Sequence, residues 1–258
     1  MNGRIALVTG AAGGIGAAVV RLLAEEGTTV VGVDLDPDRL SAMVDKLTAD
    51  GLSVRGHAAD VASAVDVEGV VDTVERETGP VDYLVNAAGV LRLGEARHLS
   101  DEDWHTTFAV NTTGVFLMSR AVTNRMIPRR QGALVTVASN AAGIARTRMA
   151  AYAASKAAAT AFTRCLGLEV ARHNIRCNVV APGSTDTPML HGMHPDGDTA
   201  AASVAGSPAA FRTGIPLGRV ARPRDVAHAV RFLLSEEAAQ VTLHALTVDG
   251  GATLGAPM

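Results

Sequence analysis

The sequence predicts an α/β fold, a Rossmann-like doubly wound parallel sheet of about seven strands with helices on both faces. Three observations predict it. Short β-branched runs alternate with longer helical segments along the 258 residues. Several of these runs are apolar at every position, which is typical of parallel strands covered on both faces. The chain is 48% hydrophobic but only 3% aromatic, a composition that suits helices packed closely on a sheet.

The elements follow one another in a regular order. Each strand candidate except the last is followed by a helical candidate, and right-handed crossovers then place helices on both faces. No Pro/Ser-rich linker divides the chain, so we expect a single domain over 1–258. The strand candidates are 5–10, 29–34, 53–60, 81–89, 132–139, 175–183 and 244–251, and the helical candidates are 14–26, 37–50, 63–78, 100–129, 150–172 and 223–237.

Segment 184–215 has no strong period and carries Pro, Gly, Asp and Ser. It follows the carboxyl end of a strand, where open α/β sheets bind ligands. A loop of this length is usually a lid or a disordered segment, and we expect a mobile substrate lid.

Composition and charge exclude several classes of function. The net charge is −3 without a basic cluster, so neither nucleic acid nor an anionic membrane is expected as a partner. No signal pattern or membrane-spanning run is present, which predicts a cytoplasmic protein. Cys165 and Cys177 are expected to be reduced and packed. No cluster has metal-ligand spacing, and His191 with His194 is not expected to bind zinc.

A glycine-rich stretch, "TGAAGGIG" at 9–16, joins the first strand to the first helix. Gly10 allows a tight turn, Gly14 lets the backbone approach a pyrophosphate, and Gly16 lets the helix pack against the sheet. The helix N-terminus supplies free N–H groups for the phosphates. Ile15 belongs to the same predicted cofactor loop.

An acidic residue, Asp34, ends the second strand 18 residues after Gly16. A carboxylate there can accept hydrogen bonds from an adenosine ribose and would repel a 2′-phosphate. No Arg or Lys stands at 11, 12, 35 or 36, so we predict NAD rather than NADP. The alternative is a glycine turn followed by a helix-capping Asp.

Two further strand ends complete the predicted nucleotide site. Asp60 and Val61 follow the third strand, where a side chain can hydrogen-bond an adenine amino group; Asp60 could instead cap the next helix. "NAAG" at 86–89 closes the fourth strand. Its small residues Ala87 and Gly89 leave room for a ribose, and Asn86 can hold the neighbouring backbone together, although a plain turn is the alternative.

Tyr152 and Lys156 lie four residues apart in a helical segment, so they share one face. A phenol is a poor base at neutral pH, but a nearby ammonium and a positive nicotinamide ring favour the phenolate. The pair can therefore accept the proton of an alcohol that loses hydride. Ser139 ends the fifth strand and could hold the substrate oxygen. Asn111 lies mid-helix, where it could mark a kink or a bound water that connects Lys156 to solvent.

Taken together, these residues resemble the short-chain dehydrogenase/reductase family and its pattern "TGxxxGxG … NAG … N … S … YxxxK". The resemblance covers essentially the whole chain. It implies a Rossmann-like fold, a nicotinamide cofactor and a homotetramer. It also implies that the segment with Pro182, Gly183, Thr185 and Thr187 faces the nicotinamide carboxamide.

A narrower resemblance, carried by stretches such as "VASNAAGIARTRMAAYAASKAA", is to the enzymes that oxidise 2,3-dihydro-2,3-dihydroxybenzoate in siderophore synthesis. It implies a small cyclic hydroxy acid as substrate. Arg146 is then the first candidate for the carboxylate, ahead of Arg92 and Arg148, and Leu91 and Met149 could line the ring.

Two alternatives stay open. An amino analogue, trans-2,3-dihydro-3-hydroxyanthranilate, would connect the protein to antibiotic pathways. A non-catalytic NAD-binding redox sensor would need the glycine loop but not the Ser139, Tyr152 and Lys156 set.

Overall fold

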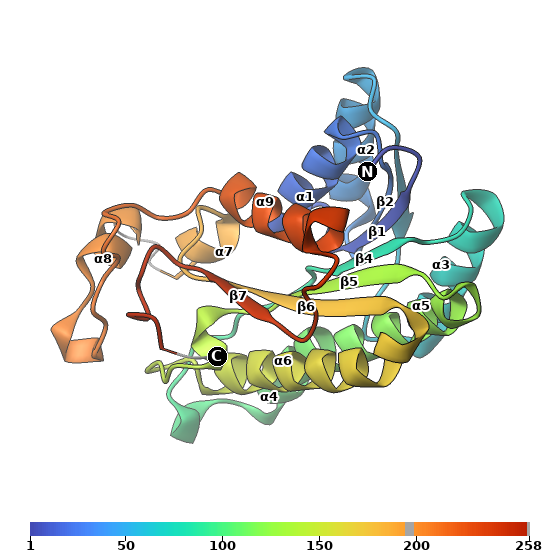
Figure 1. Cartoon of the computed structure of the whole chain (residues 1–258). Helices are drawn as coiled ribbons and strands as arrows, with labels where there is room; N and C mark the ends of the chain where they lie inside the picture. The colour runs from blue at the N-terminus through green and yellow to red at the C-terminus, as the bar shows by residue number, and fades with distance from the viewer. Residues whose placement is uncertain (194–198, 257–258) are drawn as a thin grey trace.

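The computed structural model describes residues 1–193 and 199–256, and these contain one seven-stranded, all-parallel sheet (Figure 1). The strand order is β3-β2-β1-β4-β5-β6-β7, so the order reverses between β1 and β4. This topological switch opens a crevice at the carboxyl ends of the strands. The strands are β1 Ile5–Thr9, β2 Thr29–Asp34, β3 Val54–Ala58, β4 Tyr83–Asn86, β5 Gly132–Val137, β6 Ile175–Pro182 and β7 Ala245–Val248.

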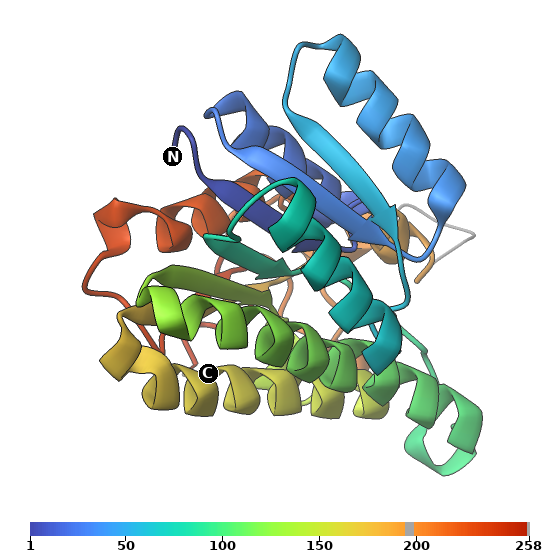
Figure 2. The ribbon, with the colours of Figure 1, turned by 90° about the vertical axis from the view of Figure 1, so that its right-hand side faces the viewer.

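Helices cover both faces of this sheet, as predicted. One face carries α1 Gly14–Glu25, α2 Pro37–Ala49 and α9 Pro223–Leu234 (Figure 1). The other carries α3 Ala64–Glu77, α5 Val115–Arg129 and α6 Ala150–Val170 (Figure 2). Each face has its own apolar core, and Leu7 and Val8 of β1 point into opposite cores because strand side chains alternate. Short 3₁₀ turns occupy Ala96–His98, Asn140–Ala142, Ala171–His173, Pro208–Ala210 and Glu236–Ala238.

One helix predicted as continuous, 100–129, is divided in the structure. It begins as α4 Asp101–Phe108, continues as a π-helix over Ala109–Gly114 and ends as α5. A π-helix is rare and is often found at a functional site. The irregular turn contains Asn111, so the sequence signal of a poor helix former in mid-helix corresponds to a real change of winding.

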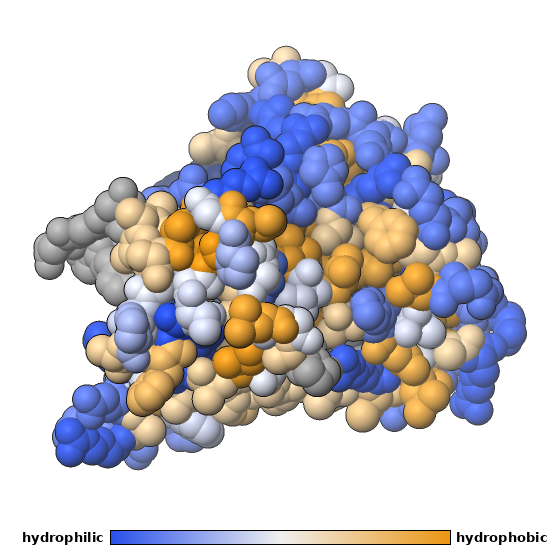
Figure 3. Space-filling model, turned by 60° about the vertical axis from the view of Figure 1, so that its left-hand side comes forward, coloured by the Kyte–Doolittle hydropathy of each residue, from blue (hydrophilic) through white to orange (hydrophobic). Residues whose placement is uncertain are grey.

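The predicted lid segment is not a simple loop. It contains α7 Pro188–His191 and α8 Thr199–Ala205, which lie beyond the carboxyl edge of the sheet (Figure 1). Figure 3 shows that apolar and polar residues are mixed over this edge, whereas the end of the molecule near α2 is hydrophilic. His194 lies outside the described residues; His191 contacts Asp186 at 2.8 Å.

The structure bears on three expectations, which concern the cysteines, metal binding and membrane-spanning helices. Both cysteines are free; Cys177 is buried as predicted, but Cys165 is exposed, because it lies on the outer side of α6. Within residues 1–193 and 199–256, no three His, Cys, Asp or Glu side chains are grouped to hold a metal ion. In the same ranges, no helix is both long and apolar enough to cross a membrane.

Candidate active site

Two adjoining pockets open at the carboxyl edge of the sheet. The first lies over the ends of β1, β2 and β4, and the second lies between the ends of β5 and β6, the loop before α6, and the lid. Their linings share five residues, so the pockets form one continuous cleft: Ile15, Ala87, Gly89, Thr187 and Met189.

The glycine loop is built from close backbone approaches. Gly10 has a φ of +65°, and a Cβ there would lie 2.7 Å from the Ala88 Cα. Gly14 has a φ of +36°, and its Cβ would lie 2.8 Å from Cγ2 of Thr187. A Cβ on Gly16 would collide with the Gly10 carbonyl. Gly16 therefore lets the start of α1 approach the backbone at the end of β1, as predicted.

The start of α1 fits a phosphate group. Its N-cap is Gly13, no side chain caps the helix, and no acidic residue lies in its first turn. The amide groups at this end are thus left for a ligand, and the helix dipole favours an anion. Gly13, Gly14 and Ile15 line the first pocket at this point, so the residues present fit a dinucleotide pyrophosphate.

Asp34 lies at the end of β2 in the wall of the same pocket. Its carboxylate accepts hydrogen bonds from the Ala12 N–H at 2.9 Å and the Asp36 N–H at 3.2 Å. Asp36, not Asp34, caps α2. The alternative of Asp34 as a helix cap is therefore wrong, and its carboxylate is held where a ribose would lie.

A residue that sequence reasoning missed, Arg39, also lines this pocket. Its guanidinium donates to the Ala12 carbonyl at 3.2 Å. The prediction of NAD rested only on the positions beside the glycine loop and Asp34, which carry no Arg or Lys. Arg39 comes from the first turn of α2, which begins at the same end of β2, and that position was the available signal.

The third and fourth strand ends complete the pocket wall. Asp60 and Val61 both line it. Asp60 accepts from the Ala62 N–H at 2.8 Å, while Ser63 caps α3, so the alternative of Asp60 as the helix cap is wrong. Val61 packs against the π-helix, since a Cβ on Gly114 would lie 2.8 Å from it.

Asn86 does not line either pocket but lies buried beneath them. Its amide donates to the Ser119 hydroxyl at 2.9 Å and to the Thr136 hydroxyl at 3.5 Å. The backbone of the following turn is held instead by Thr9, whose hydroxyl accepts from the Ala87 and Ala88 N–H groups at 3.1 and 3.2 Å. Asn86 therefore joins β4 to its neighbours, and the predicted backbone role belongs to Thr9.

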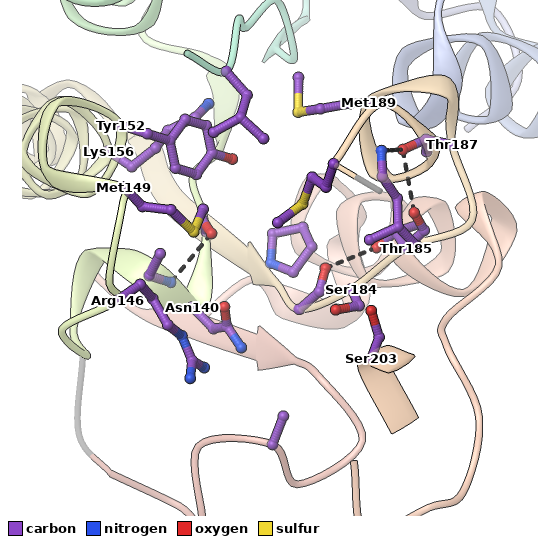
Figure 4. A pocket seen from close by; sticks show the side chains of 18 of the residues that line it. Asn140, Arg146, Met149, Tyr152, Lys156, Ser184, Thr185, Thr187, Met189 and Ser203 are labelled. Carbon is purple, nitrogen blue, oxygen red and sulfur yellow. Dashed lines mark hydrogen bonds between the residues drawn. The ribbon is translucent and has the colours of Figure 1, made fainter. Parts of the chain in front are cut away.

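The predicted proton-transfer set is brought together in the second pocket. Ser139, Tyr152 and Lys156 all line it, and the latter two side chains lie side by side on α6 (Figure 4). Tyr152 is 8% exposed and Lys156 is 4% exposed. The Lys156 ammonium donates to the Val137 carbonyl at 2.9 Å and lies 5.9 Å from the centroid of the Tyr152 ring.

Burial changes the pKa values of both Tyr152 and Lys156. It raises the pKa of Tyr152, and a hydrogen bond with Ser139 opposes that rise. Burial also lowers the pKa of the Lys156 amine to about 8. Because the ammonium is turned to Val137 and faces the ring rather than the phenolic oxygen, the desolvation of the phenol outweighs it. The prediction that this ammonium and a bound oxidised nicotinamide together favour the phenolate stays a prediction.

Asn111 does not line the pockets but supports them from below. Its side chain accepts from the Val90 N–H at 2.8 Å and donates to the Val90 carbonyl at 2.9 Å and to the Ser155 hydroxyl at 3.0 Å. A Cβ on Gly89 would lie 3.2 Å from the Lys156 amine and 3.3 Å from the Asn111 amide oxygen. The two polar groups therefore converge on Gly89, and a water relay through Asn111 stays a prediction.

The segment after β6 forms the wall that both pockets share. Pro182, Gly183, Thr185 and Thr187 all line the second pocket, and their contact with a nicotinamide stays a prediction. The Thr187 hydroxyl donates to the Thr185 carbonyl at 3.1 Å and caps α7. A Cβ on Gly183 would lie 2.7 Å from the Cβ of Asp249.

The predicted substrate residues separate into two groups. Arg146, Leu91 and Met149 line the pocket that contains Tyr152. Arg92 does not: its guanidinium is half-exposed and contacts Asp103 at 3.3 Å, and it lines a neighbouring hollow that adjoins the cleft. Arg148, which is exposed, is also absent from the lining.

Several lining residues had no sequence signal. They come from the irregular segment 184–215 and from the strand–helix loops, where neither spacing nor period indicates a site. Figure 4 shows Arg146, Met149 and Tyr152 on one side of the cavity and Thr185 and Met189 on the other. The additional lining residues include Asn140, Ser184, Met189, Met193, Ser203 and Arg212.

A buried tyrosine and lysine thus lie beside a glycine-lined cleft at the carboxyl edge of a Rossmann-like sheet, an arrangement that fits a nicotinamide-dependent oxidoreductase. Comparison with known proteins agrees. The model of the short chain dehydrogenase family matches residues 4–197. The chain therefore belongs to the short-chain dehydrogenase family, and it is an oxidoreductase that acts on CH–OH groups.

Individual relatives match over nearly the full length. The chain is 52% identical to the 2,3-dihydro-2,3-dihydroxybenzoate dehydrogenase of Bacillus subtilis (strain 168), with 99% of this chain and 98% of the relative covered. It is 42% identical to the enzyme of the same name from Escherichia coli (strain K12), with 99% of each covered. A gluconate 5-dehydrogenase from Burkholderia cenocepacia J2315, solved with NADP and tartrate, superposes with a TM-score of 0.91 at 30% identity, with 99% of this chain and 97% of that one covered.

Proposed function

We propose that the protein oxidises trans-2,3-dihydro-2,3-dihydroxybenzoate to 2,3-dihydroxybenzoate with NAD. The observation that carries the proposal is the second pocket, where Tyr152 and Ser139 share a cavity with Arg146, a cation suited to a carboxylate. Two full-length relatives bear the name of this activity.

The residues have separate tasks in this reaction. The oxidised nicotinamide, when bound, supplies the hydride acceptor and a positive charge near the phenol. Ser139 holds the carbinol oxygen by a hydrogen bond. Tyr152 accepts the carbinol proton at its phenolic oxygen, and Lys156 keeps positive charge beneath the ring. The ketone so formed tautomerises to an aromatic ring, which drives the oxidation.

NAD is the cofactor of this proposal because Asp34 stands at the ribose position. Its carboxylate is fixed by Ala12 and Asp36 and would repel a 2′-phosphate. Arg39 is the opposing charge, but its guanidinium is turned to the Ala12 carbonyl. We place the nicotinamide between Tyr152 and the Thr185–Thr187 segment.

The remaining features of the proposal follow from the family. We propose a homotetramer that works in the cytoplasm and takes part in siderophore synthesis. Support for assembly comes from a partly exposed aromatic pair on neighbouring helices: Phe116 of α5 is 38% exposed and meets Phe162 of α6 edge to face.

A turnover assay tests the proposed function. The protein is mixed with NAD and the dihydrodiol acid, NADH is followed by its absorbance, and the product is identified by mass spectrometry. We expect NADH and 2,3-dihydroxybenzoate in equal amounts. NAD binding without reduction by this acid, or by its amino analogue, would instead support a redox sensor.

A further inference from the structure

A second arginine, Arg212, belongs to the lining of the pocket that contains Tyr152 and Arg146. It comes from the far end of the lid, 66 residues after Arg146 by the numbering of the sequence. It is only partly exposed. A residue in this segment carries no sequence motif, so its place in the cavity is known from the fold alone.

The backbone around Arg212 is held in place. Its N–H donates to the Ser207 carbonyl and its carbonyl accepts from the Ser207 N–H, both at 2.9 Å. Ile215 donates to the Val204 carbonyl of α8 at 3.0 Å. The Thr213 hydroxyl donates to the Ala252 carbonyl at 3.2 Å, which joins the hairpin to the C-terminal segment. Arg212 therefore projects from a braced hairpin.

Arg146 and Arg212 both contribute guanidinium groups to the lining of this pocket. Among the described residues, the side chains of Arg146 and Arg212 form no hydrogen bond and no ion pair. Burial lowers the pKa of Arg146, and the charge of Arg212 lowers it further. The two positive charges therefore repel each other. A shared anion would relieve both the desolvation and the repulsion.

The acid near this pair already has partners. Asp249 favours the charged form of Arg146, but its carboxylate accepts from the Asn140 amide at 3.3 Å and from the Gly251 and Thr253 N–H groups at 2.9 and 3.0 Å. Asp249 is thus used to join the Asn140 turn to the segment after β7. Within the part of the chain that the structure describes, neither guanidinium donates a hydrogen bond to Asp249.

We propose that Arg212 is a second ligand for the substrate carboxylate and binds it together with Arg146. This inference rests on the proposed function for the identity of the substrate, but it concerns the carboxylate alone. Two guanidinium groups bind a carboxylate more tightly than one, and each fixes its plane. They would also disfavour an ammonium group next to that carboxylate. Arg212 therefore determines specificity for an anionic ring acid.

Ligand binding tests the proposal without turnover. The affinities of 2,3-dihydroxybenzoate and of catechol, which lacks the carboxylate, are measured by calorimetry on the NADH-loaded protein. For Arg212→Met, we expect the acid to bind about 10- to 100-fold more weakly and catechol to bind within about twofold of the wild type. Arg212→Lys should recover part of the loss. Arg219→Met, an exposed arginine outside the cavity lining, is the matched control and should leave both affinities unchanged.

The outcomes separate the two proposals. Unchanged binding of the acid by Arg212→Met would overturn the carboxylate role, and so would an equal loss for acid and catechol, which indicates damage to the pocket. If the wild type does not oxidise the dihydrodiol acid but its binding of 2,3-dihydroxybenzoate depends on Arg212, the carboxylate site stands and the proposed function fails.

Discussion

The two halves of the cleft are built differently. The dinucleotide half is made of backbone at strand ends and glycines that allow close approach, such as Gly10 against Ala88. The substrate half is made of side chains from the loop before α6 and from the lid, such as Arg146 and Arg212. The dinucleotide half requires particular residues at fixed spacing. The substrate half requires only suitable side chains that the fold brings into one cavity.

Tyr152 lies at the junction of the two halves, and its replacement should have the largest effect. Tyr152→Phe removes the proton acceptor, so we expect kcat to fall by about 10²- to 10⁴-fold. Affinities for NADH and for 2,3-dihydroxybenzoate should stay within about twofold, because the substitution removes only one hydroxyl group from the pocket lining. Steady-state kinetics and calorimetry measure both quantities. Turnover at the wild-type rate would exclude Tyr152 as the base.

The pH dependence of the free energy of unfolding should reveal the energetic cost of burying the Lys156 amine. Its folded-state pKa of about 8 lies below the ordinary 10.5, so the folded protein is penalised below pH 8, and the penalty declines as the pH rises towards 10.5. Lys156→Met removes the penalty. The stability of this variant relative to the wild type should therefore fall by about 2 kcal/mol between pH 7 and pH 10. Urea unfolding across this range measures it; a constant difference would show that Lys156 is not desolvated.

Substitutions of Asp34 and Arg39 test the dinucleotide half, because the two side chains carry opposite charges. Asp34→Ser should lower kcat/KM with NAD about 10- to 100-fold and raise kcat/KM with NADP, because the carboxylate no longer repels a 2′-phosphate and Arg39 of the same pocket can pair with it. The double variant Asp34→Ser/Arg39→Leu is the control and should lose the gain with NADP. The cofactor assignment fails if Asp34→Ser leaves the ratio of the two values unchanged.

Replacement of Arg92 should have the smallest effect, and it tests which residues belong to the substrate half. Arg92 lies outside the cavity and contacts Asp103, an exposed pair of little energetic value. Arg92→Met should change KM for the dihydrodiol acid by less than about twofold, whereas Arg146→Met should raise it about tenfold or more. Equal effects of the two variants would contradict the pocket described for the ring acid.

The same difference explains what the sequence could predict. The strand β2 was predicted at its observed bounds, and the glycine loop and Asp34 were found by position, because a parallel sheet fixes where strand ends meet. Arg39 and Arg212 were missed because their places depend on a helix start and on a lid without period. The winding of the helix at Asn111 was signalled by residue type, but its π form was not, since side-chain bonds to Val90 and Ser155 stabilise it.

The pKa of Tyr152 shows a limit of arguments from spacing. The i, i+4 relation placed Lys156 on the same face of α6, as it must. It did not show that the Val137 carbonyl would take the ammonium or that burial would dominate the phenol. The contact of the Lys156 ammonium depends on where β5 ends, and the burial of the phenol depends on the fold around α6.

The most direct measurement compares two substrates with one protein. The kcat/KM of the wild type with NAD is determined for trans-2,3-dihydro-2,3-dihydroxybenzoate and for its amino analogue, trans-2,3-dihydro-3-hydroxyanthranilate. A pocket lined by Arg146 and Arg212 predicts a preference for the hydroxy acid of about tenfold or more, since both positive charges would repel an ammonium beside the carboxylate. An equal or higher value for the amino acid would contradict the account.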